Sequence, residues 1–131
     1  MKFLLDTHAF LWMVSGDSRV PDEVRAALRS DDHSVWLSAV SVWEIAIKQM
    51  QGRLNLPAPA VAYTSRQRRS HHVSALAVEE TAASHLERLP PIHRDPFDRI
   101  LICQAIEHDM TLVTADRHIR QYPVKTLWAV D

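Results

Sequence analysis

Short apolar segments that alternate with helix-like segments constrain the fold of this chain more than any other feature of its sequence. Apolar runs stand at 3–5, 34–37 and 111–113, and each is followed by a segment typical of a helix. Parallel strands need a long crossover between them, and a helix is the usual one. The alternation therefore predicts an α/β fold with a central, mostly parallel sheet.

The predicted elements follow from local signals as well as from the alternation. Strands are predicted at 3–5, 34–37, 72–76, 111–113 and 126–130, and helices at 7–14, 21–30, 39–51, 60–69, 78–89, 96–108 and 116–121. Pro21 fits the first position of its helix, and Ser38 fits the cap of the helix that Gly52 ends. Asp95 fits an N-cap followed by Pro96 at the first helical position. With no internal repeat or linker, residues 1–131 are expected to form one domain.

Composition excludes several classes of protein. The chain carries 16 acids against 15 bases, a formal net charge of −1, which argues against a bulk polyanion binder. Only two glycines are present, which argues against phosphate-cradling loops. The single Cys103 excludes an intrachain disulfide and fits a reducing compartment, so a cytoplasmic location is expected. No apolar run suggests a membrane span or a signal peptide.

Four acids follow apolar elements in a recurring way. They are Asp6, Glu44, Asp98 and Asp116. In a parallel sheet the carboxyl ends of the strands and the starts of the following helices share one edge, where ligands bind, so these acids are expected to converge. Each also has a purely structural explanation. Asp6 and Asp116 fit helix caps, Glu44 fits a pair with Lys48 four residues on, and Asp98 fits the third position after the Asp95 cap.

Carboxylates gathered at one edge repel one another, and a hard divalent cation resolves that repulsion. Mg²⁺, with Mn²⁺ as the alternative, prefers oxygen ligands and binds a carboxylate or two together with substrate phosphate. Such a site can activate water for attack on a phosphodiester. A histidine-based zinc site is disfavoured, because the eight histidines form no paired helical motif and Cys103 has no cysteine partner.

Four stretches of the sequence resemble the PIN-domain family, and within it the VapC-type toxins of bacterial type II toxin–antitoxin pairs. The stretches are 3–8 (FLLDTH), 38–45 (SAVSVWEI), 93–102 (HRDPFDRILI) and 112–116 (LVTAD). They occur in the family's order and span almost the whole chain. The resemblance implies a three-layer α/β/α sandwich and a metal-dependent endoribonuclease that cleaves RNA by metal-activated water.

The resemblance also assigns roles to individual residues. Asp6, Glu44, Asp98 and Asp116 correspond to the family's catalytic acids. Asp6 and Asp98 are the expected direct Mg²⁺ ligands, Thr114 is expected to support the site by hydrogen bonding, and Asp95 is a secondary candidate. Three arginines beside these acids, Arg94, Arg99 and Arg117, are candidate RNA contacts, and pairing with the acids themselves explains them equally well.

The same resemblance implies partners. The family forms homodimers and binds an antitoxin protein, so a homodimer or a toxin–antitoxin hetero-oligomer is expected, with no membrane association. Most of the four tryptophans are expected in the core, and Trp12 and Trp43 are the alternative candidates for an apolar groove. The basic segment 66–72 is either an RNA contact or a solvated helix end. Cys103 is expected to be a small buried core residue.

Two other classes of protein compete with a nuclease. A PIN-like module that binds RNA or a partner without cutting would not need the full set of acids. A phosphotransfer protein with Asp6 as nucleophile is disfavoured because His8 stands where dehalogenase-type phosphatases carry a second Asp, and because Leu4-Leu5-Asp6 lacks the acid pair of receiver domains.

Overall fold

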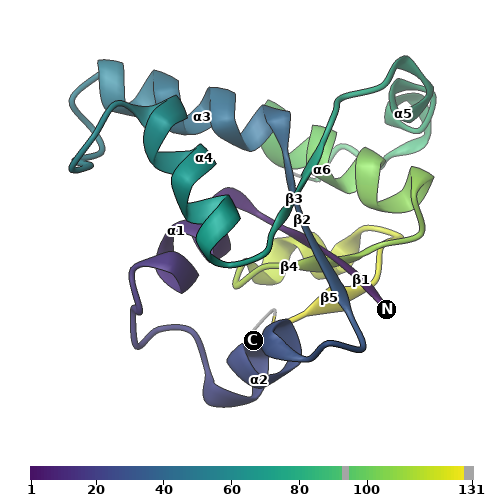
Figure 1. Ribbon diagram of the computed structural model, residues 1–131. Coiled ribbons are helices and arrows are strands. Elements are labelled where there is room, and N and C mark those ends of the chain that lie inside the picture. Colours follow the sequence, from purple (N-terminus) through teal and green to yellow (C-terminus); the bar gives the residue numbers. More distant parts are fainter. Residues whose placement is uncertain (93–94, 129–131) are drawn as a thin grey trace.

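A computed structural model describes residues 1–92 and 95–128 of the chain (Figure 1). The helices and strands follow one another in the order β1 Lys2–Leu5, α1 Thr7–Val14, α2 Asp22–Arg29, β2 Ser34–Ser38, α3 Ala39–Met50, α4 Ala60–Ser70, β3 Ser74–Leu76, α5 Glu80–Ala83, η1 Leu86–Arg88, α6 Pro96–Glu107, β4 Thr111–Val113, η2 Arg117–Gln121 and β5 Thr126–Leu127. The five strands form one sheet in the order β3-β2-β1-β4-β5, and every pairing in it is parallel. The predicted α/β class and parallel sheet are confirmed.

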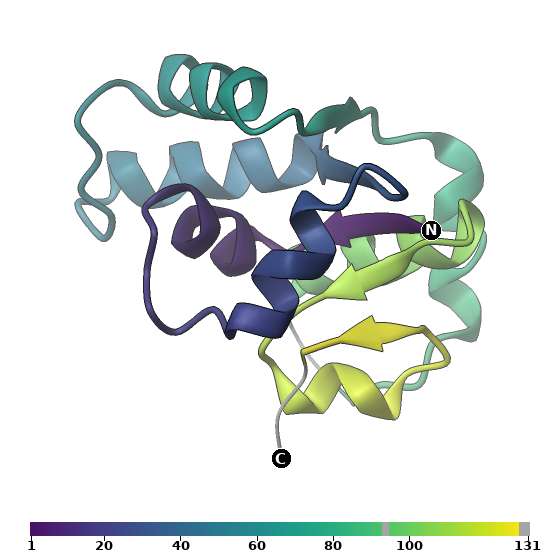
Figure 2. The ribbon, with the colours of Figure 1, turned by 60° about the horizontal axis from the view of Figure 1, so that its bottom comes forward.

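Helices cover both faces of the sheet, which gives three layers (Figures 1 and 2). Phe3 and Leu5 of β1 point into a cluster with α1 and α2, whereas Leu4 points into the opposite cluster with α6 and η2. This alternation follows from the two-residue period of a strand. Helix α3 belongs to both clusters, because Val40 packs in one and Ile45 in the other. No helix among the described residues is long and apolar enough to cross a membrane.

The direction in which successive strands are added to the sheet reverses at its central strand, β1. The chain builds outward from β1 through β2 to β3, and then returns through α6 to place β4 on the other side of β1. Such a reversal leaves a crevice outside the carboxyl ends of the two strands that flank it, and this crevice is where open α/β sheets bind ligands. Asp6 and Thr114 directly follow these two strands, β1 and β4.

Several predicted helix boundaries are confirmed in detail. The Ser38 hydroxyl accepts a hydrogen bond from the amide of Val40, 3.1 Å away, and begins α3. Asp95 accepts from the amide of Phe97 at 2.9 Å and begins α6, with Pro96 at the first helical position. Gly52 follows α3 with φ +70°, the left-handed conformation that suits glycine after a helix.

Four predicted elements are present but differ from the structure in their bounds or in the type of helix. Pro21 is the N-cap of α2 rather than its first residue, and the strand predicted at 72–76 is confined to β3 because His72 has φ 55°. The segment predicted as a helix at 116–121 is the 3₁₀ helix η2. The strand predicted at 126–130 ends at Leu127, since Trp128 has φ 84°, and residues 129–130 lie outside the described residues.

The largest difference is the helix predicted at 78–89, which is wrong. The structure has only the single turn α5 and the short 3₁₀ segment η1 there. Ala82 is the only buried residue of these two elements, so little packing supports a longer helix. The Ser84 hydroxyl also donates to the carbonyl of Thr81 at 2.8 Å, a local bond that competes with helical hydrogen bonding.

The tryptophans are less buried than expected. Trp12, Trp36 and Trp128 are half-buried, and Trp43 is 68% exposed, so Trp43 is outside the core, as its alternative placement in an apolar groove requires. Trp43 forms an exposed stripe on α3 together with Ile47 and Met50, at positions i, i+4 and i+7. We call these three residues the α3 stripe. Cys103, in contrast, is buried as predicted.

Candidate active site

Asp6 stands at the carboxyl end of the central strand, where α1 begins. Its amide donates to the carbonyl of Val113 in β4 at 3.0 Å, and its carboxylate accepts from the amide of Ala9 at 2.7 Å. The side chain is only 7% exposed, and this burial raises its pKa above the usual 3.8. Hydrogen bonds from the Thr114 hydroxyl and the Ala9 amide oppose the increase, as does the charge of His8, whereas the charge of Glu44 adds to it.

Glu44 is buried on the inner side of α3 and is held at both carboxylate oxygens. Its Oε1 accepts from the Thr7 hydroxyl at 2.6 Å, and its Oε2 lies 2.7 Å from Nζ of Lys48. The Ser41 hydroxyl lies 3.1 Å from the same Thr7 oxygen. The pair with Lys48 is thus present, but Glu44 is only 3% exposed, so this is not the solvated helix-surface pair that the structural explanation assumed.

Thr114 and Asp116 follow β4 on the other side of the crevice. The Thr114 hydroxyl oxygen accepts a hydrogen bond from the amide of Asp116 at 3.1 Å, and the hydroxyl donates a hydrogen bond to the Asp6 carboxylate. The carboxylate of Asp116 accepts from the amide of His118 at 2.9 Å and caps η2. Asp116 therefore acts as the predicted cap, and it also lies next to the residue that supports Asp6.

Asp98 reaches the same edge by a different route. Helix α6 returns the chain to the amino end of β4, so it begins at the carboxyl edge of the sheet, and Asp98 is its third residue. The amide of Asp98 donates to the Asp95 carboxylate at 3.3 Å. Both Asp95 and Asp98 are half-buried. The capping function of Asp95 is therefore observed, and Asp98 is placed in the first turn as predicted.

The four acids share one edge, but their contacts differ. Asp6 and Glu44 are buried and coupled through their charges, whereas Asp98 and Asp116 lie half-buried at the starts of α6 and η2. Within residues 1–92 and 95–128, no three His, Cys, Asp or Glu side chains are close enough to enclose a metal ion. The oxygen donors nevertheless suit Mg²⁺ by their chemistry, because Mg²⁺ keeps several waters and needs one or two carboxylates.

The predicted basic contacts are scattered. Arg117 is exposed at the start of η2, and Arg99 Nη1 donates to the carbonyl of Pro90 at 3.2 Å. Arg94 lies outside the described residues. The basic segment 66–72 is the mostly exposed end of α4 and leads to the amino end of β3, away from the acids.

Three residues around Glu44 were not among the predicted site residues. Thr7 and Lys48 contact its carboxylate, and Ser41 contacts Thr7. A signal for two of them was present, because Ser41 and Lys48 lie three residues before and four residues after Glu44 and therefore share its helix face. The contact of Thr7 joins residues 37 positions apart and needs the tertiary fold.

A cavity of about 510 Å³ adjoins the acids on the side of α1. Thr7 and Lys48, the two residues that hold Glu44, belong to its wall. The rest of the lining combines cations with aromatic and apolar side chains, and is formed by His8, Leu11, Trp12, Ser15, Arg53, Leu54, Asn55, Leu56, Pro57 and Tyr63. We call this space the catalytic-edge cavity. None of the described residues that line it is an acid.

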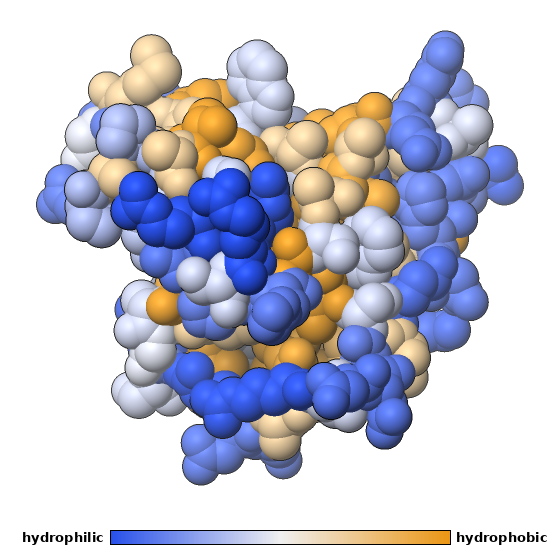
Figure 3. All heavy atoms as spheres, in the orientation of Figure 1, coloured by the Kyte–Doolittle hydropathy of each residue, from blue (hydrophilic) through white to orange (hydrophobic). Residues whose placement is uncertain are grey.

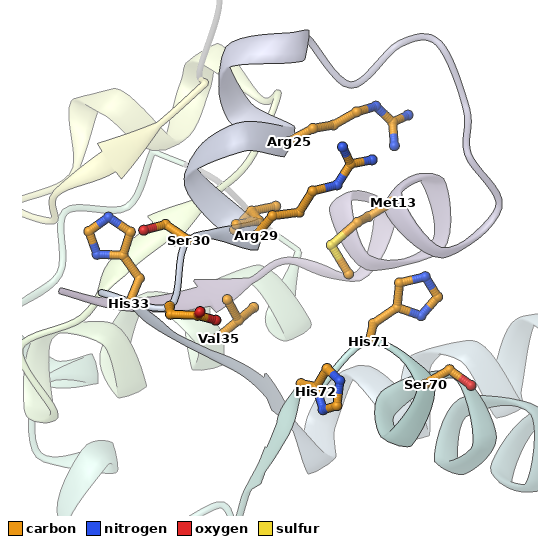
Figure 4. Close-up of a pocket in the computed structure, with 11 residues that line it drawn as sticks. Met13, Arg25, Arg29, Ser30, His33, Val35, Ser70, His71 and His72 are labelled. Carbon is orange, nitrogen blue, oxygen red and sulfur yellow. The ribbon is translucent and has the colours of Figure 1, made fainter.

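A second cavity, of about 410 Å³, lies at the amino ends of β2 and β3. Arg25 and Arg29 of α2 lie on one side of this cavity, His71 at the end of α4 lies on the other, and Met13 lies between them (Figure 4). On the surface, strongly hydrophilic side chains gather over α4 and over α2, with hydrophobic atoms in the hollow between them (Figure 3). We call this space the amino-edge cavity.

Comparisons with known proteins match the family that the sequence resembles. The family model described as "PIN domain" matches residues 3–125. Ribonuclease VapC22 of Mycobacterium tuberculosis is 31% identical over 130 residues, which cover 95% of this chain and 97% of that protein. The crystal structure of VapBC2 from Rickettsia felis, bound to a DNA fragment from their promoter, has a TM-score of 0.72 at 11% identity, covering 97% of this chain and 98% of that chain. A toxin–antitoxin complex from Klebsiella pneumoniae has a TM-score of 0.54 at 17% identity, covering 86% and 85%.

Proposed function

This chain belongs to the PIN domain family, and we propose that it is a metal-dependent endoribonuclease, the toxin of a type II toxin–antitoxin pair. The observation that carries the proposal is the buried pair Asp6 and Glu44 at the sheet's switch point, each held by its own hydroxyl donor. The choice of RNA as substrate is supported by a relative that is named a ribonuclease and that this chain matches along nearly its whole length.

In this proposal the chain's own residues divide the work. Asp6 and Asp98 hold Mg²⁺ or Mn²⁺, Thr114 fixes the Asp6 carboxylate, and Glu44 and Asp116 orient water around the ion. When bound, the ion lowers the pKa of a coordinated water molecule and stabilises negative charge on the phosphodiester. The hydrolysis joins the oxygen of water to phosphorus and breaks one phosphorus–oxygen bond, and the departing oxygen takes a proton.

The test is RNA cleavage by the purified protein during a titration with Mg²⁺ or Mn²⁺. We expect cleavage that needs the metal and is lost in Asp6→Asn and Asp98→Asn, with circular dichroism showing the native fold. A protein that binds RNA at every metal concentration but never cleaves it would instead be the non-catalytic PIN-like module.

We also propose that the α3 stripe is the contact between two copies of this chain. Trp43 and Met50 are 68% and 87% exposed, and large apolar side chains grouped on one helix mark protein interfaces. Light scattering should show a dimer for the protein and a monomer for the Trp43→Ser, Met50→Ser variant. A variant that stays dimeric would show that the interface lies elsewhere.

The antitoxin partner is proposed from the toxin–antitoxin complex with the same fold.

A further inference from the structure

The catalytic-edge cavity has a lining that suits a ligand with both a flat ring and negative charge. Lys48, Arg53 and His8 supply positive or protonatable groups, and Tyr63 and Trp12 supply aromatic rings. At about 510 Å³ it lies within the usual range of small-molecule sites, roughly 300–1,000 Å³. No acid is among the described residues that line it, so the charged groups recorded in the lining are cations, which attract an anion.

The cavity connects directly to the acids. Thr7 lines the cavity and donates to Glu44 at 2.6 Å, and Lys48 lines it and lies 2.7 Å from the other oxygen of Glu44. A ligand that fills the cavity therefore touches the residues that hold a proposed catalytic acid. This placement suits the nucleotide next to the phosphate that is cleaved.

The two aromatic residues have different surroundings. The guanidinium of Arg19 lies 4.2 Å from the centre of the Trp12 ring, and Trp128 and His8 approach the same ring with centroids 5.7 Å away. Trp12 is thus packed into the wall. Tyr63 is half-buried and lines the cavity, and its ring forms no aromatic pair with another described residue, so we expect a base in the cavity to stack on it.

Polar groups around Tyr63 are also available. No hydrogen bond joins the Asn55 amide or the Tyr63 hydroxyl to another described residue, and Asn55 is exposed. The Arg53 guanidinium has one long contact, 3.5 Å to the side-chain oxygen of Gln51. An amide beside an aromatic ring can recognise the edge of an unpaired base, and an arginine nearby can contact its phosphate.

We propose that the catalytic-edge cavity binds one unpaired nucleotide of a single-stranded RNA, next to the phosphate that is cleaved. Tyr63 stacks on the base, Asn55 contacts the edge of the base, and Arg53 contacts the backbone phosphate. This inference rests on the proposed ribonuclease function, and it names the residues of this chain that hold the nucleotide beside the cleavage point.

The experiment measures RNA binding by fluorescence anisotropy, with the Asp6→Asn protein as background so that the RNA stays intact. The probe is a fluorescein-labelled pool of random-sequence single-stranded RNA about ten nucleotides long, within the usual size of a single-strand site. A duplex of the same length is the second probe. Thermal melting checks that each variant is folded.

We expect Tyr63→Ala to weaken single-strand binding about tenfold, the loss of one stacked base, and Tyr63→Phe to stay within about twofold. Arg53→Ala should weaken binding about fivefold at low salt and less at high salt, because it loses a phosphate contact. Arg29→Ala is the matched control, since Arg29 is an exposed arginine in the amino-edge cavity. Duplex binding should be the same for Tyr63→Ala and its parent.

The inference is overturned if folded Tyr63→Ala and Arg53→Ala bind the single strand as well as Arg29→Ala does, even though the wild-type protein cleaves RNA with Mg²⁺. In that outcome the proposed function stands. If the wild-type protein neither binds nor cleaves RNA at any metal concentration, the proposed function fails, and the inference fails with it.

Discussion

The two cavities on the helical face that carries α1 have similar sizes and a similar mixture of cations and apolar side chains, yet they lie at opposite edges of the sheet. The catalytic-edge cavity shares Thr7 and Lys48 with the buried Glu44. Among the described residues that line the amino-edge cavity, Asp31 is the one acid, and it is exposed. The two cavities therefore differ in their connection to buried acids rather than in their positive charge, and we expect that connection to distinguish the substrate site.

This comparison also makes the proposed action on RNA compatible with a net charge of −1. Charges are separated locally, with buried carboxylates at the switch point and cations in the cavity beside it. The overall balance of acids and bases hides that separation. The following predictions test whether the catalytic edge and the amino edge differ in function as the geometry indicates, from the largest expected effect to the smallest.

The largest effect is expected from removing a charge at the catalytic edge. Asp6→Asn and Glu44→Gln should each reduce metal-dependent RNA cleavage by about a thousandfold, the upper range for losing one group that stabilises transition-state charge. Asp31→Asn is the matched control at the amino edge and should cleave like the wild type. Equal losses in all three variants would erase the distinction between the two edges.

Next in size is the effect of leaving Glu44 without its cation. Lys48→Met removes the group 2.7 Å from Glu44, whose side chain is buried, so the free energy of unfolding should fall by about 2–3 kcal/mol. Adding Glu44→Gln should restore part of this loss. Chemical denaturation of the two single variants and the double variant measures the coupling, and additive losses would show that the pair is not coupled.

A smaller effect, of opposite sign, is expected for the stability of Asp6→Asn without metal. Burial raises the pKa of Asp6, so the stability that this residue contributes below about pH 3.8 is lost as the pH rises through its folded-state pKa. At neutral pH the charged carboxylate therefore destabilises the fold, while asparagine caps α1 about as well. The Tm of Asp6→Asn should be a few degrees above that of the wild type in EDTA. A lower Tm would contradict this account.

The smallest effect is expected at Asp95. Its variants test whether this residue is only a helix cap or also a catalytic acid. Asp95→Asn should keep cleavage within about twofold, because asparagine caps a helix as well as aspartate does. Asp95→Ala should lower the free energy of unfolding by about 1 kcal/mol through loss of the cap on α6. If Asp95→Asn loses activity as Asp6→Asn is expected to, Asp95 belongs to the catalytic site.

Much of the fold could be predicted because local signals agree with the tertiary structure. The strand before Asp6, the Ser38 cap and the Asp95-Pro96 start each depend on neighbouring residues, and all three are confirmed. The helix at 78–89 could not be predicted correctly, because its apolar residues find too little to pack against. The exposure of Trp43 depends on which side of α3 faces the core. Because α3 is mostly apolar, its sequence does not indicate that side.

The candidate site shows the same limit. Topology alone predicts that acids after parallel strands share an edge, and the structure places all four there. Their burial and their partners depend on contacts between distant segments, such as Thr7 with Glu44, which no local pattern contains. The metal roles of Asp6 and Asp98, the single domain over 1–131 and the cytoplasmic location stay predictions.

Helix α3 carries Trp43 on its outer side and the buried Glu44 as the next residue. A body docked on the α3 stripe would therefore lie against the same turn that positions a proposed catalytic acid. Docking there would restrict the small rotations of that turn about the helix axis, and with them the range of positions open to the Glu44 carboxylate. If both proposals hold, one turn of α3 serves assembly and catalysis together, and both depend on the stiffness of that turn.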